Sequence, residues 1–159
     1  MTALIRPAGR ADVPAMSRVL TASIIDLCAT DHGNDPEALA AWTRNKSEAG
    51  VAAMLDNPDL LILVAELDGA VAAVGAITRD GTVALNYVAP TARFRGLSKA
   101  LMVRLEAELK ALGFTEGRLE ATATALKFYK AIGWIADGPQ ASGRKVNGYP
   151  MTKAGPGRT

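Results

Sequence analysis

The sequence predicts an α+β fold of three layers, in which a mixed, mostly antiparallel twisted sheet of about seven strands is flanked by helices. Three apolar runs at residues 60–67, 70–79 and 82–90 are separated by Asp-Gly pairs. Asp-Gly between apolar runs is the strongest short-range signal for a hairpin, so these runs predict a meander of three strands. Apolar residues at helical spacing precede the meander and follow it, which places helices around the sheet.

The segment before the meander predicts one strand and two helical regions. Residues 3–6 form a short strand, and residues 13–28 form a helix that ends at Cys28, a small buried apolar residue. The second region starts at Asp35-Pro36, because proline suits the first helical position. It continues to about residue 55, with a break expected near residues 46 and 47.

The segment after the meander begins with an amphipathic helix. Leucines recur on one stripe from residue 97 to residue 112, and Gly113 is the expected stop. Glu106 and Lys110 are spaced to pair across the solvent face of this helix. The remaining elements are a strand at 118–121, a helix at 124–132, and strands at 134–136 and 146–152.

Composition places the chain among globular proteins. Its 159 residues suit one domain, expected over residues 1–153, with a flexible tail at 154–159. The net charge of +2 is too small to indicate nucleic-acid binding. A single cysteine excludes an intramolecular disulfide, and no apolar run is long enough to span a bilayer. Without a signal-like N-terminus, a cytoplasmic protein with no membrane partner is expected.

The stretch RFRGLSK at residues 93–99 predicts an anion site. It lies where a strand turns into a helix, and the first N–H groups of a helix have no partner within it. The helix dipole adds partial positive charge, Gly96 allows close approach to the backbone, and Arg93, Arg95 and Lys99 add full charges. These features together predict a cradle for phosphate, although Arg95 and Lys99 also fit ordinary solvated charges at a helix end.

Two common phosphate motifs are absent. A nucleoside-triphosphate loop needs G-x-x-x-x-G-K-[ST], but Lys99 stands three residues past Gly96 and no upstream glycine is correctly placed. A dinucleotide fingerprint needs G-x-G-x-x-G, which the chain lacks. A nucleotide triphosphatase is therefore disfavoured.

What remains, VAPTARFRGLS, resembles the acetyl-CoA signature of the GNAT superfamily of N-acetyltransferases. That signature is V-x-P, a short gap, then [RQ]-x-x-G-x-[GA] opening a helix, with Arg93 and Gly96 in matching positions and Ser98 in place of Gly or Ala. The later stretch TATALKFYKAIGW resembles a second family segment, A-x-x-F-Y followed by G-[FW]. Thr122 stands there where many members carry an asparagine that contacts the cofactor.

The resemblance implies a GNAT-like fold, acetyl-CoA as co-substrate, and transfer of the acetyl group to a primary amine by direct attack. It implies pantetheine alongside the third meander strand and pyrophosphate on the glycine turn. The implied cofactor-binding residues are Asn86, Tyr87, Val88, Arg93, Phe94, Arg95, Gly96, Leu97, Ser98, Lys99, Thr122 and Phe128. A catalytically silent acyl-CoA-binding module or sensor is the alternative function.

Two side chains are candidates for proton transfer. By the resemblance, Tyr129 protonates the departing thiolate, and its alternative is a core tyrosine with a hydrogen-bonded hydroxyl. Glu120, on a predicted strand beside the cofactor site, is the candidate base, and its alternative is a solvent-facing strand residue.

Asp31 and His32 form an acidic, titratable loop where the family often builds its acceptor pocket, so they are the candidate substrate-binding residues. The alternative is a turn with Asp35 as helix cap, and then the pocket should lie near Glu120 and residues 140–149. A metal site is not expected, because Asp31, His32 and Asp35 cluster in one loop with no distant partner. The acceptor is a small-molecule or protein amine, and the resemblance allows a homodimer.

Overall fold

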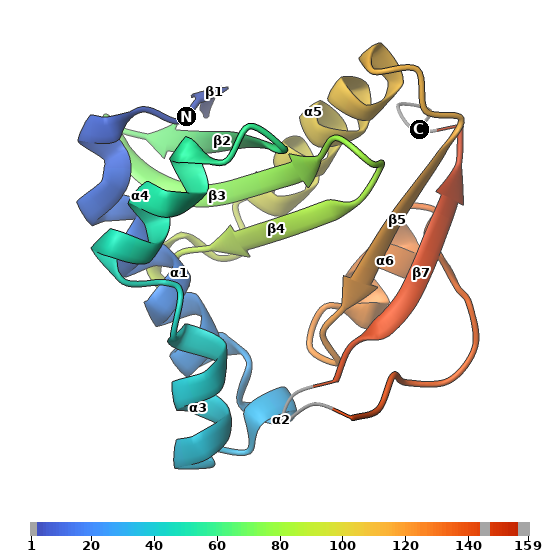
Figure 1. Ribbon diagram of the computed structural model, residues 1–159, viewed down its shortest axis with the longest axis horizontal. Helices are drawn as coiled ribbons and strands as arrows, with labels where there is room; N and C mark the ends of the chain where they lie inside the picture. Colours follow the sequence, from blue (N-terminus) through green and yellow to red (C-terminus); the bar gives the residue numbers. More distant parts are fainter. Residues whose placement is uncertain (1–2, 144–146, 156–159) are drawn as a thin grey trace.

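Seven strands form two sheets in the computed structural model, which describes residues 3–143 and 147–155 of the chain. The first sheet is antiparallel, in the order β1 (Leu4–Pro7), β2 (Leu60–Leu67), β3 (Ala70–Thr78) and β4 (Val83–Val88). The second is β5 (Glu116–Ala121), β7 (Tyr149–Ala154) and β6 (Ile135–Ala136). The predicted α+β class is confirmed, with the strands divided between two sheets instead of one (Figure 1).

Helices cover both faces of the first sheet. In β2, Ile62 and Val64 belong to one apolar cluster with α1 (Val13–Leu27) and α4 (Glu48–Asp56), while Leu63 and Ala65 belong to a second cluster with α5 (Leu97–Ala111). Successive strand side chains point to opposite faces, so a strand buried on both faces reads as a continuous apolar run. This accounts for the run of apolar residues from 60 to 65.

The close packing of α5 depends on a glycine in β3. A Cβ atom added at Gly75 would lie 2.9 Å from side-chain atoms of Leu101 and Leu105. Both leucines are fully buried. The helix therefore rests directly on the strand backbone, and this fixes its N-terminus beside the end of β4.

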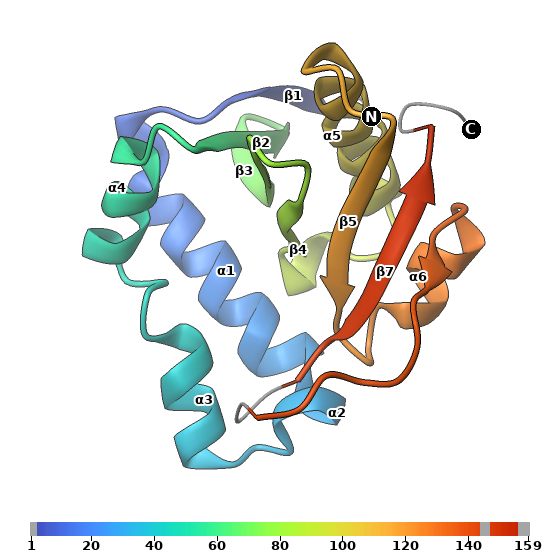
Figure 2. The ribbon, with the colours of Figure 1, turned by 45° about the vertical axis from the view of Figure 1, so that its right-hand side comes forward.

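The two sheets meet at one point and then separate. A single described bridge, between Thr82 just before β4 and Arg118 of β5, joins the two sheets in parallel, and the Arg118 N–H donates to the Gly81 carbonyl at 3.0 Å. Beyond this bridge the two strands diverge, as Figure 1 shows, and Figure 2 shows β5 and β7 side by side in the second sheet. The gap that opens between β4 and β5 is called the split below. Along it, the backbone N–H and C=O groups of the two strands do not pair with each other.

The predicted elements agree with the structure in type, with small shifts in length. The helical region after Asp35 is broken as expected, into α3 (Pro36–Thr43) and α4, and the Ser47 hydroxyl accepts from the Gly50 N–H at the start of α4. Two short helices, α2 (Ala29–His32) and α6 (Leu126–Ala131), complete the set, with single 3-10 turns at Arg10–Asp12 and Pro90–Ala92. Within the described ranges, no helix is long and apolar enough to cross a membrane. The predicted strand start at Val146 and most of the predicted tail lie outside the described residues.

One predicted surface contact is wrong. Glu106 does not face solvent to pair with Lys110: it is 4% exposed and forms an ion pair with Lys153 of β7 at 2.7 Å. The Trp134 indole N–H also donates to Glu106, at 3.3 Å. The spacing of the leucines describes only contacts within and beneath the helix. It could not indicate this partner, because Lys153 lies far along the chain, in the second sheet.

Candidate active site

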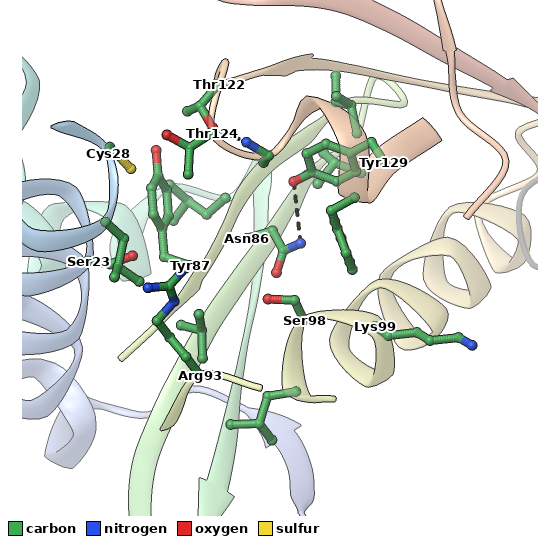
Figure 3. Close-up of a pocket in the computed structure, with 18 of the residues that line it drawn as sticks. Ser23, Cys28, Asn86, Tyr87, Arg93, Ser98, Lys99, Thr122, Thr124 and Tyr129 are labelled. Carbon is green, nitrogen blue, oxygen red and sulfur yellow. Dashed lines mark hydrogen bonds between the residues drawn. The ribbon is translucent and has the colours of Figure 1, made fainter. Parts of the chain in front are cut away.

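A cavity of about 390 Å³ opens at the split between β4 and β5. Its walls come from the end of α1, from β4, from the turn before α5, and from α6. Figure 3 shows these walls, with Asn86 of β4, Ser98 of α5 and Tyr129 of α6 directed toward one another. Leu119 and Glu120 of β5 also line it, so parts of the chain that are far apart in sequence enclose one site.

Most of the residues predicted for the cofactor surround this cavity. Every one except Arg95 lines it, and so do both residues predicted for proton transfer, Tyr129 and Glu120. Thr122 lies in the wall, and its hydroxyl accepts from the Ala125 N–H at 3.1 Å, in the turn before α6. The cofactor motif and the tyrosine segment, far apart in sequence, therefore meet in space.

The turn before α5 has the backbone geometry of an anion site. Gly96 has φ +74° and Phe94 has φ +66°, both in the left-handed region, where a bulky residue is uncommon. Turns with such conformations form concavities lined by N–H groups. The Ala100 N–H donates to the Gly96 carbonyl at 3.0 Å, so the N–H groups of residues 97–99 precede the first bond of the helix.

The space above this turn is open. A Cβ atom added at Gly96 would find nothing within 4 Å, so the glycine leaves room that any other residue would fill. Close to the same turn, the Arg93 guanidinium lies 4.6 Å from the centre of the Phe94 ring. The geometry fits a pyrophosphate group, because bare backbone, unpaired helix N–H groups and arginine charge coincide.

The Tyr129 hydroxyl is a buried acid in the cavity. Tyr129 is 7% exposed, and the Asn86 side-chain amide donates to its oxygen at 3.3 Å. Because that oxygen accepts a hydrogen bond, its own proton remains available to another acceptor in the cavity. Burial raises the pKa of Tyr129 to about 12, so the phenol is a proton donor at neutral pH.

The end of α1 supplies a wall that sequence reasoning missed. Ser23, Leu27 and Cys28 line the cavity, although the helix was expected only to pack in the core. Ser23, a polar residue beside the apolar stripe of α1, was the one sequence signal that this helix contributes to a cavity wall. Burial raises the pKa of the Cys28 thiol to about 12, which keeps it protonated. A protonated thiol is a poor nucleophile, so this cysteine is not suited to carry an acyl group.

A second cavity, of about 750 Å³, lies against the same split. The two cavities share six lining residues on β4, β5 and the following loop: Val83, Ala84, Tyr87, Leu119, Glu120 and Thr122. The second wall also includes Trp42, Asn45 and Lys46 from α3 and the loop after it, Arg118 of β5, and Asn147 and Gly148 just before β7. The fallback expectation of a pocket near Glu120 and residues 140–149 agrees with this location.

Asp31 and His32, predicted for the acceptor, line neither cavity. The Asp31 carboxylate accepts from the Ala123 N–H at 2.5 Å and from the Thr124 hydroxyl at 2.7 Å. His32 is 3% exposed; its Nε2 lies 2.8 Å from the Ile24 carbonyl, and its Nδ1 accepts from the Asn34 N–H. Both side chains hold backbone in place, so their positions favour the alternative of a structural turn.

Removing the Asp31 carboxylate is therefore expected to destabilise the fold. Asp31→Ala leaves the N–H groups at the start of the α6 loop without their acceptor, which should lower the free energy of unfolding by about 1–3 kcal/mol. Urea unfolding measures this change. An unchanged free energy of unfolding, together with a raised KM for the amine, would restore Asp31 to the acceptor pocket.

Comparison with known proteins agrees with this geometry. Residues 28–154 match the family model described as the acetyltransferase (GNAT) domain. An IAA acetyltransferase of Azospirillum brasilense is 36% identical over 93 residues, which cover 54% of this chain and 61% of that protein. The match thus spans less than two thirds of the relative's length.

Solved structures show the same fold. A GCN5-related N-acetyltransferase from Rhodopseudomonas palustris superposes with a TM-score of 0.85 at 26% identity, covering 97% of this chain and 96% of that one. The PaiA N-acetyltransferase of Thermoplasma acidophilum, in complex with coenzyme A, gives a TM-score of 0.80 at 21% identity, covering 97% and 99%. Since the family model matches most of the chain, including both segments that resemble its signature, this protein belongs to the GNAT family of acetyltransferases.

Proposed function

We propose that the chain is an acetyl-CoA-dependent N-acetyltransferase that acetylates a primary amine within a ternary complex. The observation that carries the proposal is the position of the Tyr129 hydroxyl, in the same cavity as the Gly96 turn and with its proton unused by Asn86. The PaiA relative, which shares the fold, was crystallised with coenzyme A. The residues of this chain suit the same ligand.

Acetyl-CoA supplies the acetyl group as a thioester when it is bound. In the proposal, N–H groups of residues 94–99 hold the pyrophosphate, and Asn86, Tyr87 and Val88 of β4 lie along the pantetheine arm. A backbone N–H near Val88 donates to the carbonyl oxygen as negative charge develops on it.

Proton movements are assigned to two side chains. Glu120, which lines both cavities, accepts the proton that the amine must lose, directly or through water. Tyr129 donates its phenolic proton to the departing thiolate. The protonated Cys28 thiol favours direct transfer from thioester to amine over an acylated enzyme.

The pyrophosphate assignment predicts the effect of a methyl group at Gly96. Gly96→Ala is expected to weaken acetyl-CoA binding by about tenfold or more, because the new Cβ takes the open space at the turn. Gly69→Ala is a matched control: Gly69 has φ +81°, an added Cβ there also meets nothing within 4 Å, and it lines neither cavity. Calorimetric titration of both variants should separate ligand loss from backbone strain; equal affinities would remove Gly96 from the site.

The catalytic proposal has a direct test against the silent binding module. Acetyl-CoA is incubated with a panel of primary amines, and thiol release is followed over time. We expect release to depend on both protein and amine. Binding of acetyl-CoA, seen as a raised melting temperature, without release on any amine would favour the silent module.

A further inference from the structure

The second cavity contains a buried lysine that no carboxylate offsets. Lys46 is 7% exposed and lines this cavity. Its ammonium donates to the Asn45 side-chain oxygen at 2.6 Å, and Asn45 lines the same cavity, so both members of this pair belong to the cavity lining. Among the residues that the structure describes, no ion pair is formed by Lys46.

A second buried lysine, Lys153, differs from Lys46 in having a carboxylate partner. Lys153 is buried to a similar degree, at 9% exposed, and it has the Glu106 carboxylate at 2.7 Å together with the Ile132 carbonyl at 2.9 Å. Burying a charge costs several kcal/mol unless an opposite charge accompanies it. Among the described residues, the Lys46 ammonium has only a neutral amide as its partner, so its charged form lacks the compensation that Lys153 has.

An anion in the second cavity would provide the missing charge. Burial lowers the pKa of Lys46, and a bound carboxylate would favour its charged form again. The cavity also has Glu120 at the split, where a positively charged amine would be attracted, and the rings of Trp42 and Tyr87 in its wall. Its polar groups thus present opposite charges in one space, which matches a molecule carrying both an amine and a carboxylate.

Among the described residues of this wall, the other cation is already engaged. Arg118 donates to the Asp80 carbonyl at 2.7 Å, is 3.8 Å from the Asp80 carboxylate, and has an exposed side chain. Lys46 is therefore the better placed of the two to hold an anion.

We propose that the acceptor is an amino acid, a primary amine that also carries a carboxylate, and that Lys46 binds this carboxylate in the second cavity. The proposal rests on the N-acetyltransferase function above. The amine then lies at the split between β4 and β5, facing the first cavity, while the carboxylate is held on the side away from the thioester.

The experiment compares amino acids with their carboxamides, which keep the amine and the side chain but lose the negative charge. In one arm, thiol release from acetyl-CoA is measured for each pair. In the other arm, N-acetylated amino acids and their matched carboxamides are titrated into the complex with coenzyme A, so that binding is measured without turnover. The proteins are wild type, Lys46→Met, and Lys110→Met as a control on the exposed side of α5.

For at least one side chain, we expect wild type to prefer the acid over the carboxamide by roughly tenfold to a hundredfold in both arms, the effect of one charged hydrogen bond. Lys46→Met should reduce this ratio to about one, and Lys110→Met should preserve it. The melting temperature of Lys46→Met without ligand should equal or exceed that of wild type, because an unpaired buried charge is removed.

Each other outcome contradicts the proposal. A wild-type ratio near one for every pair, or a ratio that Lys46→Met leaves unchanged, shows that Lys46 holds no carboxylate. Loss of turnover with acids and carboxamides alike would make Lys46 part of the proton transfer instead. If no amine causes thiol release, the N-acetyltransferase function fails, and the titration arm still decides whether Lys46 binds a carboxylate.

Discussion

Tyr129→Phe is expected to lower kcat by about a hundredfold, the usual effect of one acid–base group, with little change in acetyl-CoA affinity. The substitution keeps the aromatic ring, whose centre lies 5.2 Å from that of Phe128 and 6.4 Å from that of Trp134. Only the phenolic proton is lost. Steady-state kinetics and single-turnover measurements of thiol release provide the comparison.

The pKa of Tyr129 adds a second expectation. Since burial raises it to about 12, the phenol stays protonated through neutral and mildly alkaline pH. The wild-type rate should therefore show no fall due to this group below about pH 10.

Tyr149→Phe, in β7 and outside both cavities, serves as the control for Tyr129→Phe. If single-turnover rates are the same in Tyr129→Phe and wild type, Tyr129 takes no part in the proton transfer.

Glu106→Gln is expected to lower the free energy of unfolding by about 3–5 kcal/mol, because it leaves the buried Lys153 ammonium without its opposite charge. The pair joins α5 to β7 at 2.7 Å, and both side chains are almost fully buried. The change in size is minimal, so lost packing contributes little. Urea unfolding followed by circular dichroism gives the free energy.

A neighbouring pair on the same helix provides the control. Glu108 pairs with Arg104 at 3.0 Å, but both side chains are partly exposed, so Glu108→Gln should cost less than about 1 kcal/mol. Replacing both buried partners with methionine should restore most of the stability lost by Glu106→Gln, since no unpaired charge remains. Equal effects of Glu106→Gln and Glu108→Gln would show that the buried pair contributes no more than a surface pair.

Local sequence signals were sufficient to predict the helices and strands and the anion-binding turn before α5. Asp68-Gly69 predicted the first hairpin, and both residues have positive φ, at +52° and +81°. Gly96 predicted a bare helix start, which depends only on adjacent residues. These features follow from short-range backbone chemistry, so the sequence alone was enough to expect them.

Contacts between distant elements were not predictable in the same way. Glu106 has an obvious i,i+4 partner in Lys110, and nothing nearby indicates that its partner is Lys153 in the second sheet. Asp31 lies in an acidic segment that was expected to bind the substrate. Its carboxylate instead accepts hydrogen bonds from the backbone N–H groups of residues 123 and 124, more than ninety positions away. Lys46 was noted only as the place of an expected break between helices, and the fold shows that it is buried and lines a cavity.

The most direct test of the account is the mass balance of the reaction on the amine panel. The purified protein, acetyl-CoA and each amine are incubated together, and free coenzyme A and acetylated amine are quantified by mass spectrometry. We predict equal amounts of N-acetylated amine and free coenzyme A, formed only when all three components are present. Free coenzyme A without an acetylated amine, or no consumption of acetyl-CoA by a protein that binds it, would contradict the assignment as an N-acetyltransferase.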